Sequence, residues 1–222
     1  DSFVSRGLGD VYKRQLTFSA ALPEFILILS ALVLVLVAAF GQSTISHVKM
    51  VRSLSLLAYT VGFGALFLVP QGTVELFNGM FIIHGLGTYM KGLVLLGGFF
   101  ACWLVSENWG EGIDRAEFHL LVLIAILGML LMISANDLIS LYMAVELQSL
   151  PLYVVAAMRT GSLKSSEAGL KYFLLGALSS GMLLYGASLV YGFSGSTGFG
   201  DIAASLSTGE ISVGMTVGMV FL

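Results

Sequence analysis

The chain has 222 residues, of which 57% are hydrophobic and only 10% are charged, and its formal net charge is −3. An average soluble domain carries about a quarter charged residues, so a compact soluble monomer of this composition would expose a large apolar surface to water. The composition argues against a soluble enzyme and a disordered linker, and the lack of a basic block argues against a nucleic-acid binder. We expect the chain to lie in a lipid bilayer.

The reactive side chains narrow the chemistry further. The single cysteine, Cys102, rules out an internal disulfide and a cysteine-ligated iron–sulfur cluster. The three histidines, His47, His84 and His119, lie far apart in the sequence and show no metal-ligand spacing. The residues therefore predict neither a metal site nor a cofactor site in this chain.

The sequence divides into apolar segments, and a helix crosses the hydrocarbon core with about 20 such residues. Six segments are predicted to span the membrane, at 25–40, 53–69, 85–106, 118–134, 138–158 and 165–191. A glycine-rich loop over 192–200 and a seventh apolar run over 211–222 follow. At 1.5 Å per residue the seventh run reaches only about 18 Å, so we expect a fragment that stops inside a helix. The predicted fold class is an all-α polytopic membrane protein with six complete transmembrane helices and the start of a seventh.

The first fifteen residues differ from the rest of the chain, because they hold Arg6, Lys13 and Arg14. They resemble either the basic region before a signal sequence or a non-native leader, and we interpret residues 1–15 as a leader. The remainder is expected to divide into residues 16–116, with the first three helices, and residues 117–222.

Basic residues outside the leader predict the orientation in the membrane. Those in the connections follow the first, third and fifth segments, as Lys49, Arg52, Arg115, Arg159 and Lys164, whereas Lys91 and Lys171 lie within segments. By the positive-inside rule these connections should be cytoplasmic.

Glu146 is the leading candidate for a functional residue. It is close to the middle of the fifth segment, where a carboxylate is costly unless it is protonated or paired. Helical spacing places Tyr142, Ser149 and Tyr153 on the same face, and these three form the predicted supporting pathway. Two interpretations remain, an ion pathway or a protonated glutamate that only links helices, and we favour the ion pathway.

Lys171, near the start of the sixth segment, is the second candidate. We expect it to lie about 12 Å from the depth of Glu146 at 1.5 Å per residue, a gap that bridging waters would close. Glu167 precedes it by four residues, the spacing of a simple helical ion pair. A relay member and a lysine at the helix start both remain open.

Other polar and small residues in the segments are interpreted structurally. Lys91 and Asp137 lie near segment ends and are taken as interface anchors, with Asp137 also capping the fifth helix. Two sets of small residues at four-residue spacing predict close helix packing: Gly176, Ala177, Ser180 and Gly181 in the sixth segment, and Gly214 and Gly218 in the seventh run.

Residues 136–199 closely resemble one family. The acid in E-L-Q-S-L, the loop S-L-K-S-S-E-A and the helix start K-Y-F-L-L-G-A-L-S-S-G occur together in subunit N of bacterial proton-pumping NADH:quinone oxidoreductase, which is respiratory complex I. The resemblance extends from about Leu16 onward.

The resemblance implies a fold of about fourteen helices with inverted repeats, and it places residues 117–222 at the start of the first proton-channel repeat. It matches Glu146 to the glutamate of the proton channel and Lys171 to the sixth-helix lysine. It implies a translocase subunit of the bacterial inner membrane without its own redox centre. NAD, FMN, iron–sulfur clusters and quinone are then expected elsewhere in the complex, with the other membrane subunits as partners. Alternatives are an Mrp-type cation/proton antiporter or membrane-bound hydrogenase subunit, and a non-catalytic membrane scaffold.

Overall fold

The computed structural model describes residues 19–40, 45–70, 72–105, 115–208 and 212–222. Within these residues six helices are long and apolar enough to cross a membrane, as predicted. They are α2 (Leu22–Phe40), α3 (Ile45–Ala65, extended by the 3-10 turn η1, Leu66–Leu68), α4 (Gly85–Leu104), α5 (Ala116–Ser134), α6 (Leu138–Ala156) and α7 (Leu163–Ser194). The predicted leader lies outside the described residues. The predicted fold class, an all-α polytopic membrane protein, is confirmed.

Two predicted boundaries were wrong. The second span was predicted to begin at residue 53, but α3 begins at Ile45 and includes Lys49 and Arg52. The charges mark where the helix leaves the hydrocarbon core rather than where the helix starts, and the Arg52 guanidinium donates to the Val105 carbonyl at the end of α4, at 3.1 Å. The predicted loop over 192–200 is shorter, because α7 continues to Ser194 and α8 (Phe199–Thr208) begins before its end.

The seventh apolar run is helical, as α9 (Val213–Phe221), and it packs against the end of α7. The prediction of close packing at Gly214 and Gly218 is confirmed. A Cβ added at Gly218 would come within 3.1 Å of the Gly186 carbonyl oxygen, so side chains here would push the two helices apart.

A short antiparallel hairpin, which the sequence did not predict, joins α3 to α4. Its strands are β1 (Val74–Leu76) and β2 (Phe81–Ile83), and its tip hydrogen-bonds to the connection between α5 and α6. Asn136 donates its backbone N–H to the Met80 carbonyl and its amide Nδ2 to the Gly79 carbonyl, each at 2.8 Å. The hairpin therefore fixes the turn from which α6 begins.

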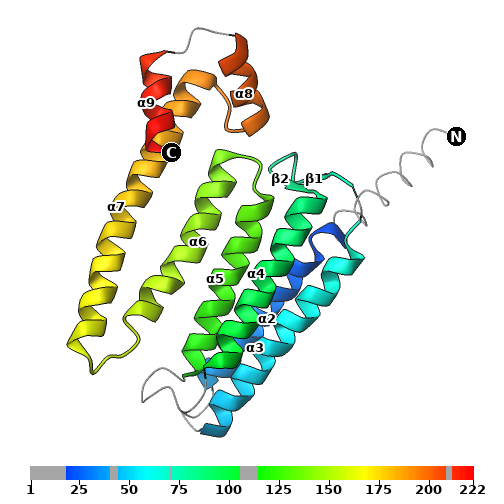
Figure 1. Cartoon of the computed structure of the whole chain (residues 1–222), viewed down its shortest axis with the longest axis vertical. Helices are drawn as coiled ribbons and strands as arrows, with labels where there is room; N and C mark the ends of the chain where they lie inside the picture. Colours follow the sequence, from blue (N-terminus) through cyan, green and yellow to red (C-terminus); the bar gives the residue numbers. More distant parts are fainter. Residues whose placement is uncertain (1–18, 41–44, 71, 106–114, 209–211) are drawn as a thin grey trace, which may run out of the picture.

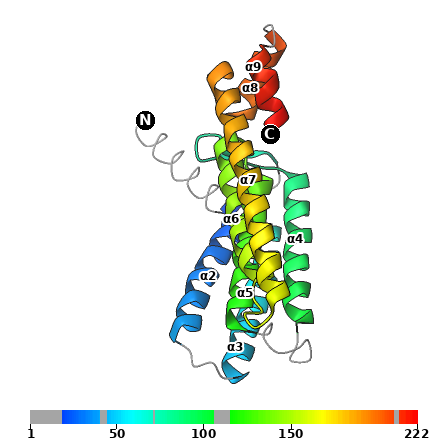
Figure 2. The same ribbon diagram turned by 90° about the vertical axis from the view of Figure 1, so that its left-hand side faces the viewer.

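The helices lie side by side along the long axis of the molecule (Figures 1 and 2), and α5 is the central one. It packs against α2, α3, α4 and α6, and half of its span is buried. The core between α2, α3, α4 and α5 includes Leu27, Tyr59, Leu95 and Leu123. By contrast, α7 is only 11% buried over its span and packs mainly against α6 and α9, so it presents a long apolar face to the surroundings.

Glycine sets the distance between α5 and α6. A Cβ added at Gly128 would lie 2.6 Å from the backbone nitrogen of Gln148 and 3.0 Å from the carbonyl oxygen of Ala144. These contacts are to backbone atoms, which cannot rotate away. The two helices therefore reach their observed separation only because residue 128 has no side chain.

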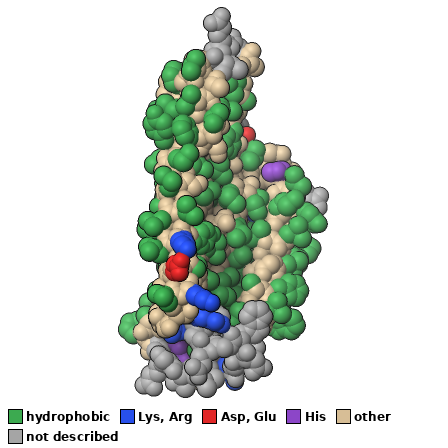
Figure 3. Space-filling view, turned by 60° about the vertical axis from the view of Figure 1, so that its left-hand side comes forward, with side chains coloured by type: hydrophobic (Ala, Val, Ile, Leu, Met, Phe, Trp, Pro, Cys, Tyr) green, Lys and Arg blue, Asp and Glu red, His purple; other side chains and the backbone are tan. Residues whose placement is uncertain are grey.

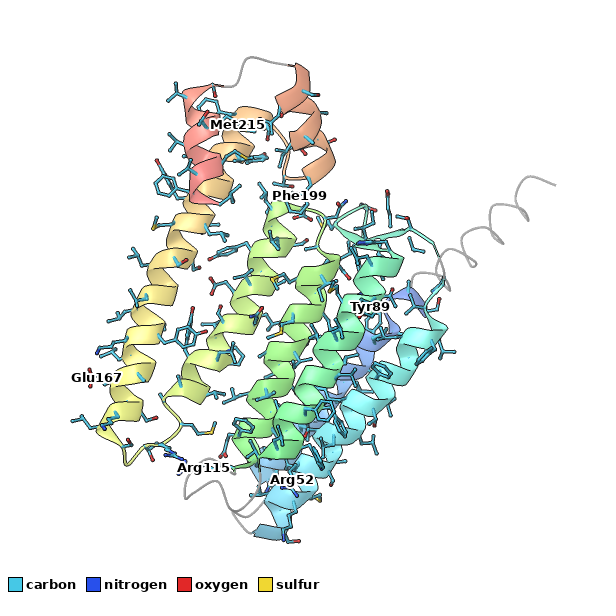
Figure 4. All side chains as sticks on the ribbon, in the orientation of Figure 1. Arg52, Tyr89, Arg115, Glu167, Phe199 and Met215 are labelled. Atoms are coloured by element: carbon cyan, nitrogen blue, oxygen red, sulfur yellow. The ribbon has the colours of Figure 1, made fainter. Side chains whose placement is uncertain are left out.

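Apart from Lys91, the basic side chains of the described residues lie toward one end of the molecule. Figure 4 shows Arg52 and Arg115 at this end and Phe199 and Met215 at the opposite end. The space-filling view in Figure 3 shows the same separation, with Lys and Arg at the lower end of a surface that is otherwise largely hydrophobic.

This separation of charge gives a topology that labelling can test. In intact cells that express the full-length protein, Lys49→Cys and Lys164→Cys should resist a membrane-impermeant thiol reagent, because the basic end should be cytoplasmic. Met80→Cys on the hairpin, where Met80 is 53% exposed, is the control and should react. The reverse labelling pattern would contradict the orientation.

The contact at Gly128 gives a stability prediction. Gly128→Ala should lower the free energy of unfolding by about 1–3 kcal/mol, because α5 and α6 must separate or distort to admit the methyl group. Gly97→Ala in α4 is the matched control, since a Cβ there meets nothing within 4 Å. Thermal unfolding in detergent measures both variants, and equal melting temperatures would contradict the packing role of Gly128.

Candidate functional site

The start of α6 is fixed by a side-chain cap. Asp137 accepts hydrogen bonds from the Ser140 backbone N–H at 2.7 Å and from the Ser140 hydroxyl at 2.8 Å. This satisfies one of the amide groups that the first turn of a helix leaves unpaired. The prediction that Asp137 caps this helix is confirmed, and the cap places Glu146 at the ninth position of α6.

The packing of α6 on α5 then decides which way Glu146 points. Ala144 and Gln148 form the contact with Gly128 of α5. Each lies two residues from Glu146, which is about 200° around a helix of 3.6 residues per turn. Glu146 therefore faces away from α5 and toward α7, which is the other neighbour of α6.

Glu146 meets a serine hydroxyl from α7. The Ser180 hydroxyl donates to Glu146 Oε1, and Ser180 Oγ also lies 3.3 Å from the Tyr142 hydroxyl oxygen. All three residues are half-buried. The carboxyl group and the two hydroxyls form a connected chain of exchangeable protons between α6 and α7.

The other two members of the predicted supporting pathway make different contacts. The Ser149 hydroxyl donates to the Val145 carbonyl of its own helix at 2.7 Å. Tyr153 packs edge-to-face against Tyr172, with ring centroids 4.8 Å apart, and its hydroxyl occupies the space that a side chain on Gly176 would need. Of the predicted supporting pathway, the structure joins only Tyr142 to Glu146, through Ser180. The Ser149 hydroxyl bonds within α6, and Tyr153 packs α6 against α7.

Lys171 pairs with Glu167, with Nζ 2.5 Å from Oε1, and both side chains are more than half exposed. Lys171 precedes Ser180 by nine residues, which is about 13 Å along α7 at 1.5 Å per residue. Since Ser180 marks the level of Glu146, the structure keeps the separation between the two predicted residues that the sequence indicated. Figure 4 shows Glu167 near the basic end of α7.

A second carboxylate in the helices is buried and pairs with a cation through one of its oxygens. The Lys91 ammonium in α4 lies 2.5 Å from Glu24 Oε1 in α2, and the side chains are 2% and 7% exposed. The interpretation of Lys91 as an interface anchor was wrong, because an anchoring lysine extends to the membrane surface whereas this one points into the helix bundle.

Sequence reasoning missed two partners, Ser180 and Glu24. Ser180 was interpreted only as a small packing residue, and its contact with Glu146 depends on the register between α6 and α7, which no local pattern specifies. Glu24 marked the edge of the first segment. A signal for it existed, since Lys91 is a charge within the third segment and Glu24 is an acid at the same predicted end of the bundle.

Comparison with known proteins defines the class. The family model described as NADH:quinone oxidoreductase/Mrp antiporter, TM, matches residues 135–222. The chain is 46% identical to NADH-quinone oxidoreductase subunit N of Parvibaculum lavamentivorans over 207 residues, and 47% identical to that of Rhodospirillum rubrum over 218 residues. These matches cover 92% and 94% of the chain, and 42% and 43% of the relatives.

Solved structures show the same arrangement of helices. A chain of respiratory complex I from Thermus thermophilus with bound aureothin aligns with a TM-score of 0.73 and 32% identity, over 90% of this chain and 42% of that one. A chain of an archaeal membrane-bound sulfane sulfur reductase shares the fold, with a TM-score of 0.70, 22% identity, and coverage of 91% and 42% of the two chains.

The arrangement of the helices is that of an antiporter-like membrane subunit, and residues 135–222 match the corresponding family model. Within that class, the chain is a homologue of subunit N of bacterial NADH-quinone oxidoreductases over about nine-tenths of its length. The resemblance found in the sequence is confirmed. The chain spans about two fifths of the length of these curated relatives.

The two ion pairs give contrasting predictions. Lys91→Met should destabilise the protein by about 3–5 kcal/mol, because it leaves the buried Glu24 carboxyl without its charge partner. Lys171→Met removes the exposed pair with Glu167, of the same N–O distance, and should change stability by less than about 1 kcal/mol. Thermal unfolding of both variants in detergent measures the difference, and equal effects would contradict the burial assigned to the Glu24–Lys91 pair.

Proposed function

We propose that the chain contributes to the proton-translocating membrane subunit of an NADH:quinone oxidoreductase in a bacterial inner membrane, with Glu146 as the acid that binds and releases the proton. The chain is 46% identical in sequence to a subunit N over 92% of its length, and this similarity supports the assignment to that subunit. The observation that carries the residue assignment is the contact between Glu146 and Ser180 across α6 and α7. In this proposal other subunits hold the redox groups and surround this one in the membrane.

The hydroxyl partners suit a carboxyl group that changes its protonation state. A serine or tyrosine hydroxyl both donates and accepts. When Glu146 is ionised, the Ser180 hydroxyl donates to its oxygen. When Glu146 is protonated, its own O–H donates to Ser180 Oγ, and the serine proton turns toward the Tyr142 oxygen. Each state therefore keeps its hydrogen bonds, whereas a fixed cationic partner would favour the ionised state alone.

Lys171 has a separate role in this proposal. Its exposed ion pair with Glu167 holds it near the basic end of α7. From there it is about 13 Å along the helix to Ser180, which marks the level of Glu146. Waters between α6 and α7 would carry the proton over this gap, with Lys171 as the positively charged group at its end. Tyr153 supports this path by packing against α7, and Ser149 lies beside it on the same face of α6 with its hydroxyl bonded to the Val145 carbonyl.

Replacing the acid tests the proposal. Glu146→Gln in the full-length protein, assembled in its complex, should lower NADH-driven proton pumping by at least about tenfold, because an amide cannot exchange the proton that acid–base transfer requires. Glu117→Gln is the matched control, since it changes an exposed acid at the start of α5 that has no place in the proposed path, and it should pump within about twofold of the parent. Assembly is checked by the yield of the purified complex, and parental pumping by an assembled Glu146→Gln variant would overturn the assignment.

Neighbouring serines test the hydroxyl chain. Ser180→Ala should slow pumping several-fold, because it interrupts the connection from Glu146 to Tyr142. Ser179→Ala changes an adjacent, exposed serine of the same helix and should have little effect. If both variants pump equally, Ser180 has no part in the path and Glu146 must exchange its proton through other groups.

A further inference from the structure

The connection between α5 and α6 is paired with other backbone on both of its sides. On one side Ala135 bridges to Phe81 of the hairpin, and the hydrogen bonds from Asn136 to the hairpin tip continue this pairing. On the other side Asp137 bridges to Gly198, which lies in the connection between α7 and α8. Both bridges are antiparallel. The residues before α6 are therefore the middle one of three paired segments, and we call this arrangement the three-segment pairing.

Two backbone hydrogen bonds join the middle segment to the α7–α8 connection. The Leu138 N–H donates to the Thr197 carbonyl at 3.0 Å, and the Phe199 N–H donates to the Asn136 carbonyl at 3.2 Å. Figure 4 shows Phe199 beside the start of α6. The Leu138 side chain is buried, and it packs in a cluster with side chains of α7, α8 and α9, which are Ala187, Val190, Ile202 and Met215. The first residue of α6 is thus bound to the segment that follows α7.

The hairpin anchors the three-segment pairing to the rest of the molecule. Its residues Leu76 and Ile83 are buried in a cluster with Ala20 and Ala21, which precede α2. The middle segment is therefore held from the packed helices on one side and holds the α7–α8 connection on the other.

This arrangement joins α6 and α7 at both of their ends. At the basic end, residues 157–162 connect the two helices covalently. At the hairpin end, the three-segment pairing ties the start of α6 to the residues after α7. Glu146 lies between these ends, about 12 Å from Leu138 along α6. Sliding α6 by the rise of one residue, about 1.5 Å, would stretch or break its hydrogen bond with Ser180, because O–H···O distances span a range of only about 0.5 Å.

We propose that Phe199 and Leu138 are positioning residues for Glu146, because they hold the start of α6 to the α7–α8 connection and so set the register of the Glu146–Ser180 contact. The importance of that contact for pumping rests on the function proposed above. Phe199 acts through its backbone N–H. As the first residue of α8 it has an N–H without an acceptor in its own helix, and this group is free to bond the middle segment instead.

Two substitutions of Phe199 separate the hydrogen bond from the side chain. Phe199→Pro and Phe199→Ala both remove the aromatic ring, but only proline also removes the N–H. Proline is tolerated at the first position of a helix, and the preceding Gly198 is in a bridge pairing, which suits the extended backbone required before proline. A difference between the two variants therefore reports the bond to Asn136.

Infrared pH-difference spectra of the full-length protein in its complex measure the outcome. The carboxyl band of Glu146 is identified by its loss in Glu146→Gln, and its position reports the hydrogen bond from Ser180. Phe199→Pro should shift this band in the same direction as Ser180→Ala and slow pumping several-fold relative to Phe199→Ala, whose band should stay at the parental position. If Phe199→Pro and Phe199→Ala both keep the parental band, the positioning role is wrong, whether or not Glu146→Gln stops pumping.

A second pair of variants keeps the test decisive if Phe199→Pro fails to accumulate. Leu138→Ala removes the buried contact at the start of α6 and should shift the Glu146 band, whereas Ile139→Ala changes an adjacent side chain that is 61% exposed and should not. Equal band positions in these two variants would also overturn the proposal. A shifted band together with parental pumping by Glu146→Gln would support the positioning of Glu146 and contradict the proposed function instead.

Discussion

The structure depends on one constraint, which is that the hydrocarbon interior of a membrane supplies no water to polar groups. Every ionisable side chain within the helices must therefore find its partner in the protein or in a confined hydrated space. The chain meets this constraint in two ways. Glu24 has a cation as its partner, whereas Glu146 has hydroxyls, and this difference decides what each carboxyl group can do. A cation favours the ionised carboxylate, while hydroxyls accommodate both protonation states.

Several of the groups that position Glu146 lie far from it in the fold. The hairpin tip holds the connection before α6, Asp137 caps the first turn, and Gly128 lets α5 approach the backbone of α6. That approach uses the face of α6 opposite Glu146, which leaves the acid directed at α7. A rigid contact on one face of α6 thus orients an exchangeable group on the other. Since α7 is largely uncovered by the described residues, the acid lies at the boundary between a packed four-helix core and a helix with an open apolar face.

Composition and charge spacing were sufficient to predict the membrane class and the six spans, because the length of a span is set by the bilayer and its apolar character is local. The position of Glu146 and the capping role of Asp137 were also local features of the sequence. The partners were not. The contact of Ser180 with Glu146 and that of Glu24 with Lys91 depend on the relative registers of separate helices. The two strands of the hairpin have three residues each, which is too short for an alternating strand pattern to be recognised in the sequence. Lys171 could be placed by depth alone, while Ser149 and Tyr153 share a helical face with Glu146 yet make their described contacts elsewhere.

The central claim is that Glu146 changes its protonation state between hydroxyl partners, and infrared difference spectroscopy measures this directly. Spectra of the full-length protein in its complex, recorded with and without NADH-driven turnover, report the carbonyl stretch of protonated carboxyl groups. The account predicts a carboxyl band that changes with turnover, is lost in Glu146→Gln and shifts in Ser180→Ala, because the serine hydrogen-bonds the carboxyl oxygen. An identical difference band in the parent and in Glu146→Gln would contradict the account.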